Sequence, residues 1–143
     1  MSDRYFLDTN LFVYCFDRTD HRKQQIAEKW VMRALKDHVG VISSQVIQEF
    51  FNVATRKFAQ PMKAPECRAY LETVLSPLCE IFPSLSLYHQ ALTLKEETGF
   101  SFYDTLIVTA ALEANCRILY SEDLHPGQII DGLKIQNPFA KDA

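Results

Sequence analysis

Ser101-Phe-Tyr-Asp-Thr-Leu-Ile-Val-Thr-Ala-Ala-Leu-Glu-Ala114 is the stretch of sequence that decides the fold of this chain. It is apolar almost all the way round, a pattern typical of a helix buried inside a core rather than one lying upon it. One carboxylate, Asp104, stands in the first turn, and Ile107, Val108 and Ala111 follow it on the same face. Because an uncompensated buried charge is costly, this pattern predicts a partner for Asp104.

Two partners are consistent with the local sequence. In the first interpretation, Ser101 caps the helix and Asp104 completes a capping box, helped by the helix dipole. In the second, Asp104 is a metal ligand, which requires companion carboxylates elsewhere in the chain. The stretch alone does not choose between them.

Short strands alternate with helices along the rest of the chain, each bounded by cap or turn residues. The expected strands cover residues 4–7, 39–42, 79–82, 116–120 and 133–135. The expected helices cover residues 11–16, 21–36, 44–58, 66–75 and 86–98. This alternation predicts the α/β class, with a parallel sheet covered by helices on both faces. We find no repeat or linker, so residues 1–143 are expected to form a single domain.

The composition excludes several classes of protein. No apolar run is long enough to span a bilayer and no signal peptide is visible, so we expect a cytoplasmic protein without a membrane partner. The cysteines lack the spacing of a zinc site and mostly lie in apolar segments, where a reducing compartment would keep them as small buried hydrophobes. They are Cys15, Cys67, Cys79 and Cys116.

The net charge of −3 gives no global basic surface for nucleic acid. Residues 1–63 hold ten Lys and Arg against seven Asp and Glu, whereas residues 64–143 hold five against eleven. Binding to nucleic acid would therefore depend on a local patch or on metal ions.

Four carboxylates fall where ligand sites gather in such a sheet, at the carboxyl ends of strands and the helix starts that follow. Asp8 follows the first strand, Asp123 follows the strand that ends at Tyr120, and Asp104 heads the buried helix. Glu49 lies in the second turn of the helix after residues 39–42, on its apolar side. Close carboxylates raise each other's pKa unless a cation joins them, and oxygen ligands alone suit Mg²⁺ or Mn²⁺.

Each acid also has a plainer explanation when taken singly. Asp8 is a candidate helix cap, Asp123 a turn residue, and Glu49 a solvent-exposed side chain. Four such coincidences at strand ends are less expected than a common site. Glu122 competes with Asp123 for the fourth position, and spacing alone does not decide between them.

Four motifs of this chain resemble the acidic motifs of PIN-domain nucleases. They are Leu7-Asp-Thr-Asn10, Ser44-Gln-Val-Ile-Gln-Glu49, Ser101-Phe-Tyr-Asp104 with its apolar helix, and Tyr120-Ser-Glu-Asp123. Their order and spacing span nearly the whole chain. A bare domain of this length is similar to the VapC-type toxins of bacterial toxin–antitoxin pairs.

The resemblance implies a three-layer sandwich with a short-stranded parallel sheet, and it implies a set of site residues. The metal ligands that would carry catalysis are Asp8, Glu49, Asp104 and Asp123. Asn10 and Ser121 would lie behind these ligands and orient them. The family pattern also favours Asp123 over Glu122.

The function implied by the resemblance is metal-dependent endoribonuclease activity, with one or two Mg²⁺ or Mn²⁺ ions hydrolysing single-stranded or loop RNA to leave 5′ phosphates. As a toxin, the protein would inhibit translation, form a homodimer and be held inactive by a cognate antitoxin. The alternatives are a PIN nuclease of RNA processing and a PIN-like RNA-binding or scaffold module without catalysis. A haloacid-dehalogenase-like phosphatase is disfavoured, because Asn10 stands where its second Asp is required.

Overall fold

The computed structural model describes residues 3–141, and its centre is a six-stranded sheet in the order β3-β2-β1-β4-β6-β5. The strands are β1 Tyr5–Leu7, β2 Gly40–Ser43, β3 Cys79–Ile81, β4 Ile118–Tyr120, β5 Ile129–Ile130 and β6 Leu133–Gln136. Every neighbouring pair is parallel except β5 and β6. The predicted parallel sheet is confirmed for β1, β2, β3, β4 and β6, and the antiparallel strand β5 is the exception.

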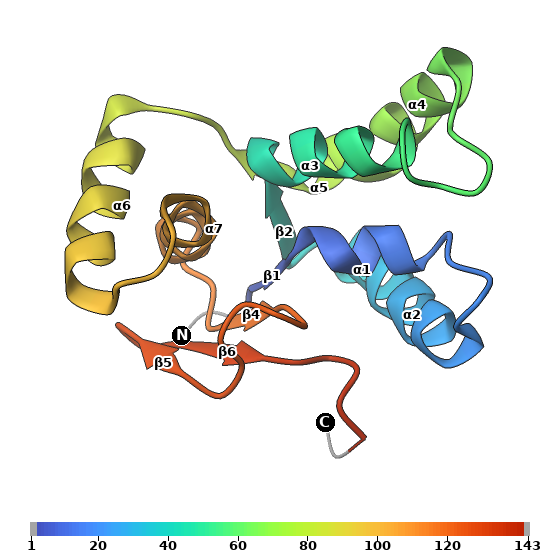
Figure 1. The fold of residues 1–143 in the computed structure, drawn as a ribbon. Coiled ribbons are helices and arrows are strands. Elements are labelled where there is room, and N and C mark those ends of the chain that lie inside the picture. Colours follow the sequence, from blue (N-terminus) through green and yellow to red (C-terminus); the bar gives the residue numbers. More distant parts are fainter. Residues whose placement is uncertain (1–2, 142–143) are drawn as a thin grey trace.

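Helices cover this sheet on both sides (Figure 1). They are α1 Thr9–Tyr14, α2 His21–Asp37, α3 Ser44–Ala54, α4 Ala64–Tyr70, α5 Ser76–Leu78, α6 Leu85–Thr98 and α7 Phe102–Glu113. In Figure 1, α6 and α7 lie to the left of the central strands, and α1 and α2 lie to the right. The α/β sandwich expected from the sequence is therefore the observed architecture.

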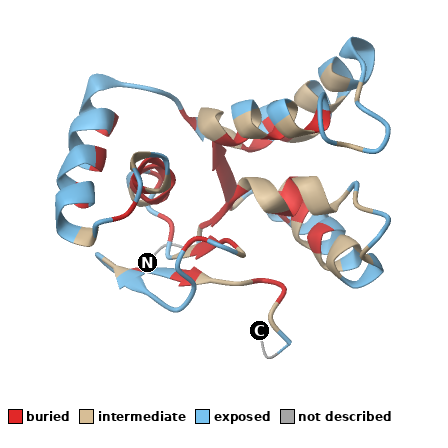
Figure 2. Cartoon of the chain, viewed as in Figure 1, coloured by how far each residue is buried: buried red, intermediate tan, exposed pale blue. Residues whose placement is uncertain are grey.

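The core is built from the central strands and from α7. Phe6 and Leu7 of β1 are fully buried, and every residue of α7 from Thr105 to Ala111 is buried. Figure 2 shows the contrast with α6, whose outer face is exposed along its length. The prediction that residues 101–114 form a buried helix is confirmed. Because α7 is packed on all sides, the position of its first turn relative to the sheet is fixed.

Two helices differ in extent from the sequence prediction. The helix expected to reach Phe58 ends at Ala54, where the Thr55 hydroxyl donates to the Phe51 carbonyl at 2.6 Å and competes with continued helix. The helix expected over 66–75 begins two residues earlier and changes at Leu71–Leu75 to a π-helical turn.

Smaller corrections concern starts and ends. α1 begins at Thr9 rather than at residue 11, because Asp8 already acts as its N-cap. α6 begins at Leu85, because the Ser84 hydroxyl accepts from the Leu87 N–H at 3.0 Å. The antiparallel strand β5 was not predicted, since two residues carry too little pattern. Of the four cysteines, Cys116 is buried and the other three are half-buried.

The topology brings distant segments to one edge of the sheet. β1 lies between β2 and β4, and the chain crosses from one side of β1 to the other between β3 and β4. The Asp8 N–H donates to the Tyr120 carbonyl at 3.0 Å, which aligns the ends of β1 and β4. Crevices at such crossover points are where open α/β sheets bind ligands. Within residues 3–141, no helix is both long enough and apolar enough to cross a membrane.

Candidate active site

A pocket of about 550 Å³ opens at the carboxyl ends of β1, β2 and β4. All four of the carboxylates predicted from the sequence line it: Asp8, Glu49, Asp104 and Asp123. Asn10 also lines the pocket. The structure thus brings together acids that lie up to 115 residues apart in the chain.

Asp8 forms the buried floor of the pocket, with 8% of its surface exposed. One carboxylate oxygen accepts from the Thr9 N–H at 2.7 Å, and the other accepts from the buried Ser121 hydroxyl at 2.7 Å. Burial raises the pKa of Asp8 to about 6; the charges of Glu49 and Asp123 add to the rise, and the two hydrogen bonds oppose it. Asp8 caps α1 and also presents a carboxylate to the pocket.

Glu49 is the second floor residue and is half-buried. Its carboxylate accepts from the Thr9 hydroxyl at 2.6 Å and from the Gln45 side-chain amide at 3.1 Å. The Gln45 amide also donates to the Tyr103 carbonyl at 3.2 Å, which links α3 to the start of α7. Glu49 therefore faces the pocket and is not the fully solvent-exposed side chain of the plainer explanation.

Asp104 lies at the rim, and its side chain is 43% exposed. The expectation of a lone buried charge is therefore wrong, because the first turn of α7 opens into the pocket while the rest of the helix is buried. Ser101 does cap the helix, since its hydroxyl accepts from the Asp104 N–H at 3.2 Å. The nearest basic atom is Nε2 of His125 at 4.0 Å, on a ring stacked on Phe100.

Asp123 is the second rim acid and is exposed. Its carboxylate accepts one long hydrogen bond, at 3.3 Å, from the Asn10 side-chain amide. Ser121, two residues before Asp123, is fully buried. Its hydroxyl donates to Asp8, as described above, and its oxygen accepts from the Leu124 N–H at 3.3 Å. Asn10 and Ser121 thus contact Asp123 and Asp8 respectively, in positions suited to orienting them.

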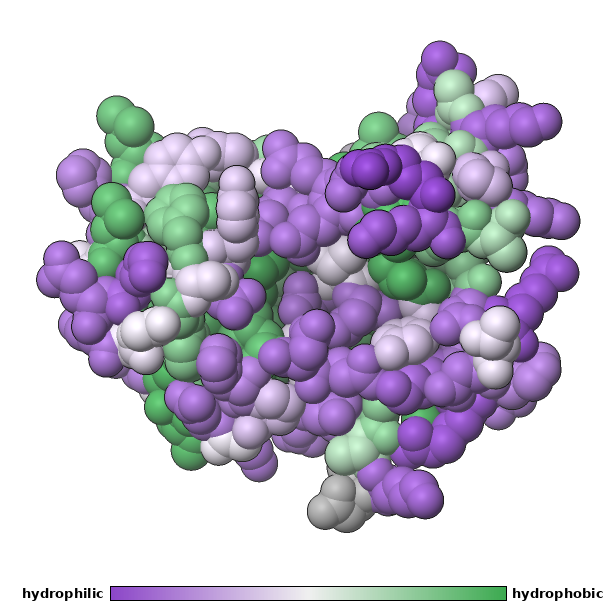
Figure 3. Space-filling model, in the orientation of Figure 1, coloured by the Kyte–Doolittle hydropathy of each residue, from purple (hydrophilic) through white to green (hydrophobic). Residues whose placement is uncertain are grey.

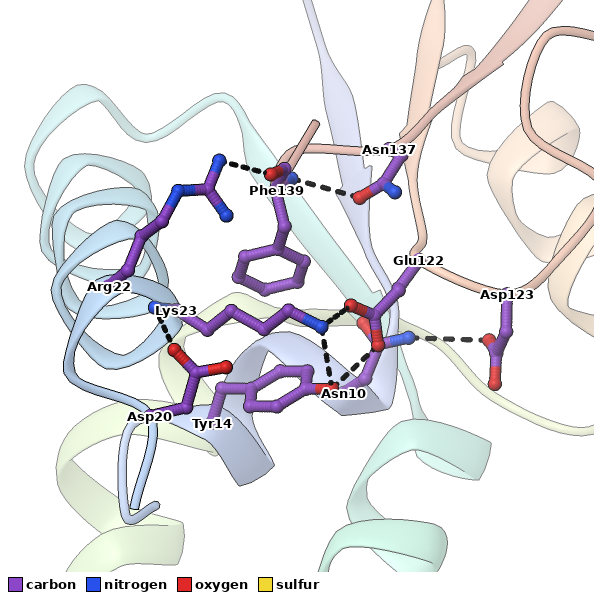
Figure 4. A network of polar contacts seen from close by, with 9 residues as sticks. All are labelled: Asn10, Tyr14, Asp20, Arg22, Lys23, Glu122, Asp123, Asn137 and Phe139. Carbon is purple, nitrogen blue, oxygen red and sulfur yellow. Dashed lines mark hydrogen bonds and ion pairs between the residues drawn. The ribbon is translucent and has the colours of Figure 1, made fainter. Parts of the chain in front are cut away.

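Glu122 lies at the edge of the pocket, but its carboxylate is already engaged (Figure 4). It accepts from the Tyr14 hydroxyl at 2.6 Å and forms an ion pair with Lys23. Asp123 has no such cationic partner among residues 3–141. This difference in pairing favours Asp123 over Glu122 as the carboxylate available to a cation.

The sequence of residues 5–128 matches the PIN domain family. The chain belongs to the PIN domain family. No curated protein sequence matches it at a significant level. The match covers the four acidic motifs, so the resemblance that they suggested is confirmed at the level of the family.

Solved structures with the same fold include two bacterial toxin–antitoxin assemblies. A toxin–antitoxin complex from Klebsiella pneumoniae contains a chain 21% identical to this PIN domain, with a TM-score of 0.63, covering 94% of this chain and 97% of that one. VapBC2 from Rickettsia felis, bound to a DNA fragment from its promoter, gives 21% identity and a TM-score of 0.63 over 93% and 97% of the two chains.

The third similar structure is VapC20 of Mycobacterium tuberculosis, described as a toxin that cleaves the sarcin–ricin loop. It is 19% identical, with a TM-score of 0.59, over 84% of this chain and 92% of that one. At these identities the likeness establishes the shared fold, which agrees with the sheet and helix order of this PIN domain.

The chemistry of the donor set fits a hard divalent cation, because every candidate ligand is a carboxylate oxygen. Within residues 3–141, however, no three His, Cys, Asp or Glu side chains stand close enough together to hold an ion without rearrangement. Of the four acids, Asp104 and Asp123 have the weakest contacts to hold their carboxylates, at 4.0 Å to His125 and 3.3 Å to Asn10.

Several residues of the site were missed by the sequence analysis. Thr9 lies inside a quoted motif but was given no role, and Gln45 stands one helical turn before Glu49, a spacing that could have revealed it. Tyr14, Lys23 and His125 carry no comparable signal. Their positions follow from tertiary packing alone.

Proposed function

We propose that residues 1–143 form one catalytic PIN domain, a Mg²⁺- or Mn²⁺-dependent endoribonuclease that acts as the cytoplasmic toxin of a toxin–antitoxin pair and inhibits translation by cleaving RNA. The observation that carries the proposal is the meeting of four carboxylates from separate segments in one pocket at the ends of parallel strands. The fold shared with VapC20 and with toxin–antitoxin assemblies supports it.

In this proposal Asp8 and Glu49 would hold the metal ion from the floor, and Asp104 and Asp123 would supply further carboxylate ligands from the rim. The ion would lower the pKa of a bound water and stabilise the leaving oxygen. Water would attack phosphorus and leave its oxygen on the phosphate as the bond to the 3′ oxygen breaks. The proton that the water loses is balanced by one that the 3′ oxygen takes up, so the products are a 5′ phosphate and a 3′ hydroxyl. Asn10 and Ser121 orient Asp123 and Asp8 through the hydrogen bonds described above.

A non-catalytic RNA-binding module is the weaker alternative, because it gives no reason to keep a desolvated carboxylate whose pKa is raised to about 6 beside two further acids. A phosphatase of the haloacid-dehalogenase type is disfavoured more strongly. Asn10 replaces the second Asp it needs, and the Asn10 amide is committed to Asp123. A PIN nuclease of RNA processing uses the same site and differs only in its substrate.

For the antitoxin, we propose that an inserted Arg or Lys pairs with the acids and displaces the metal ion. Metal and partner must then weaken each other's binding. Raising Mn²⁺ at constant ionic strength should lower the affinity for the partner, and replacing its inserted Arg by Ala should remove this dependence. Affinity that stays constant across the titration would place inhibition elsewhere on the domain.

A second copy of the chain is the partner that we propose for the surface at α6. Large apolar side chains are exposed there, with Phe82 61% and Leu85 78% accessible, and Figure 3 shows hydrophobic surface on the side where α6 lies. A second pocket, of about 430 Å³, lies between α3, α6 and α7. Tyr88 and Phe102 line it and extend the apolar surface of α6. Leu85→Glu should convert a dimer to a monomer in light scattering; a wild-type monomer contradicts the proposal.

The test of the proposed function is incubation of the purified protein with total RNA, with Mn²⁺ or with excess EDTA, beside Asp104→Asn. We expect cleavage by the wild type with Mn²⁺ only, and fragments whose new 5′ ends are phosphorylated. Cleavage that persists in EDTA, or that Asp104→Asn performs at the wild-type rate, would contradict the nuclease assignment.

A further inference from the structure

Glu122 stands at the centre of a polar network outside the set of proposed metal ligands (Figure 4). The Tyr14 hydroxyl donates to one of its carboxylate oxygens at 2.6 Å, and Lys23 of α2 pairs with the other. Lys23 also donates to the Tyr14 hydroxyl at 3.3 Å. Both oxygens of Glu122 therefore have partners, and neither is free for a cation while the network holds.

Phe139 covers this network from the C-terminal segment. Its ring meets that of Tyr14 edge to face at 4.9 Å, and the Lys23 ammonium lies 5.7 Å from its centroid. Arg22 donates to the Phe139 carbonyl at 2.5 Å, and Phe139 is only 3% exposed. We call Tyr14, Lys23, Glu122 and Phe139 the Glu122 clamp. Its C-terminal member lies beyond residue 128, where the match to the PIN family ends.

The surroundings make the Lys23–Glu122 pair stronger than an ordinary surface ion pair. The two side chains are only 27% and 24% exposed, so solvent screens their attraction less than it would at an open surface. Glu122 also receives a hydrogen bond from a neutral donor, Tyr14. Burial is the largest cause of the raised pKa of Tyr14, and this hydrogen bond adds to it. The clamp thus fixes the Glu122 side chain between two helices.

Asp123, the adjacent residue, has no comparable anchor of its own. Its carboxylate is exposed and receives one hydrogen bond of 3.3 Å from Asn10. Before Glu122 in the chain, the Ser121 N–H donates to the Gln136 carbonyl at 3.0 Å, and after Asp123 the Leu124 N–H donates to the Ser121 hydroxyl oxygen at 3.3 Å. The backbone that carries Asp123 is therefore held by Ser121 and Glu122 before it and by Leu124 after it.

We propose that the Glu122 clamp positions Asp123 at the rim of the acidic pocket, so that Glu122 and Lys23 act on the metal ion through the loop rather than by touching the ion. This inference rests on the proposed function, since it assumes that Asp123 is a metal ligand. It makes α2 and the C-terminal segment part of the machinery that shapes the site.

The alternative role for Glu122, that of a metal ligand, predicts the opposite change in Mn²⁺ affinity when Lys23 is removed. If Glu122 is a ligand that Lys23 withholds, then removing Lys23 frees a carboxylate and Mn²⁺ binds more tightly. Electrostatics alone also predicts tighter Mn²⁺ binding, because loss of the Lys23 charge removes a repulsion between this side chain and the ion. Only a positioning role weakens Mn²⁺ binding when a positive charge is removed.

The experiment is calorimetric titration of Mn²⁺ into the wild type, Lys23→Met, Lys23→Arg and Lys29→Met. Lys29 is an exposed residue of the same helix and serves as the matched control for loss of charge. We expect Lys23→Met to weaken Mn²⁺ binding about tenfold, as losses of groups that orient metal ligands do, and Lys23→Arg to restore most of it. Lys29→Met should leave affinity unchanged or slightly higher.

Two further measurements separate the possible failures. Amide hydrogen exchange at Leu124 in metal-free protein should be faster in Lys23→Met and in the milder Tyr14→Phe, while the core amides of α7 stay protected. Tighter Mn²⁺ binding by Lys23→Met would contradict the proposal that the clamp positions Asp123. Exchange at Leu124 and Mn²⁺ affinity equal to those of the wild type would contradict it as well. Absence of Mn²⁺ binding by the wild type instead overturns the proposed function, and the exchange rates still report on the clamp.

Discussion

The floor and the rim of the acidic pocket are built in opposite ways. The floor acids, Asp8 and Glu49, each receive two hydrogen bonds of 2.6–3.1 Å and are buried or half-buried. The rim acids, Asp104 and Asp123, are held by one weak contact each, at 4.0 and 3.3 Å; Asp123 is exposed and Asp104 has a side chain that is 43% exposed. The four carboxylates therefore share a pocket but not an environment.

This difference separates two requirements of a cation site. A floor that is fixed before the ion arrives avoids reorganisation at the moment of binding, but it keeps a desolvated charge in the metal-free protein. A rim carboxylate held by only one weak contact can turn toward the ion, which agrees with the absence, among residues 3–141, of any ready-made cluster of three ligands. Stability and metal binding should thus respond differently to changes at the two levels.

The largest expected effect is on catalysis, where floor and rim act as one unit. Asp8→Asn and Asp104→Asn should each lower RNA cleavage by at least about a hundredfold, and the double variant should lose little more, because residues that act together are non-additive. Single-turnover cleavage of one defined RNA measures this. Losses that multiply in the double variant would mean that floor and rim contribute separately.

The next effect is on stability and should appear at the floor only. Asp8→Asn in EDTA at pH 8 should raise the free energy of unfolding by up to about 2–3 kcal/mol, the equivalent of the rise in the pKa of Asp8 to about 6. The amide oxygen can still accept from the Thr9 N–H, and the amide NH₂ group can donate to the Ser121 oxygen in place of the bond that the carboxylate accepted. Asp104→Asn, at an exposed position, should melt at the wild-type temperature or slightly above. Urea unfolding checks both. A clearly destabilised Asp104→Asn would favour the capping role.

The pH dependence of stability follows from the same carboxyl. Its pKa is higher in the folded chain, at about 6, than the ordinary 3.8, so between these values the folded protein binds more protons than the unfolded one. Stability of the metal-free protein should therefore fall as pH rises through this window, and the penalty should be complete above pH 6. The difference in stability between Asp8→Asn and the wild type, measured from pH 4 to 8, isolates this contribution. A difference that does not grow with pH would contradict it.

The smallest expected effects are the losses of stability on replacing Ser121, which supports the floor acid Asp8, and Asn10, which supports the rim acid Asp123. Ser121→Ala leaves one Asp8 oxygen and the Leu124 N–H without their partner, and should cost about 1–3 kcal/mol at pH 8. Asn10→Ala removes a single 3.3 Å bond to an exposed carboxylate and should cost less than about 0.5 kcal/mol. Equal losses in thermal unfolding would show that the rim is as firmly held as the floor.

The sequence predicted the sheet, the buried helix and the four acids, because each leaves a local pattern that survives without tertiary information. Apolar residues all round 102–113 require burial, and an acid directly after a strand must lie at its carboxyl edge. Strand ends on parallel neighbours then meet at one edge. That logic places Asp8 and Asp123 together without reference to any contact between them.

The unequal environments of the acids could not be read in the same way. Asp104 is exposed because the first turn of α7 emerges from the core, and Glu122 is withdrawn because Lys23 and Tyr14 reach it from α2 and α1. These are contacts across about a hundred residues, set by how helices pack. Residue type and spacing determine which groups can meet, but packing determines which of them stays available.

The most direct test of the central claim is a Mn²⁺ titration of the RNA-free protein, followed by calorimetry, for the wild type and for one variant at each level, Asp8→Asn and Asp104→Asn. We expect the wild type to bind Mn²⁺, and both variants to lose most of that affinity while remaining folded, because floor and rim must hold the ion together. Binding by either variant with wild-type affinity would contradict the claim that these carboxylates form one metal site.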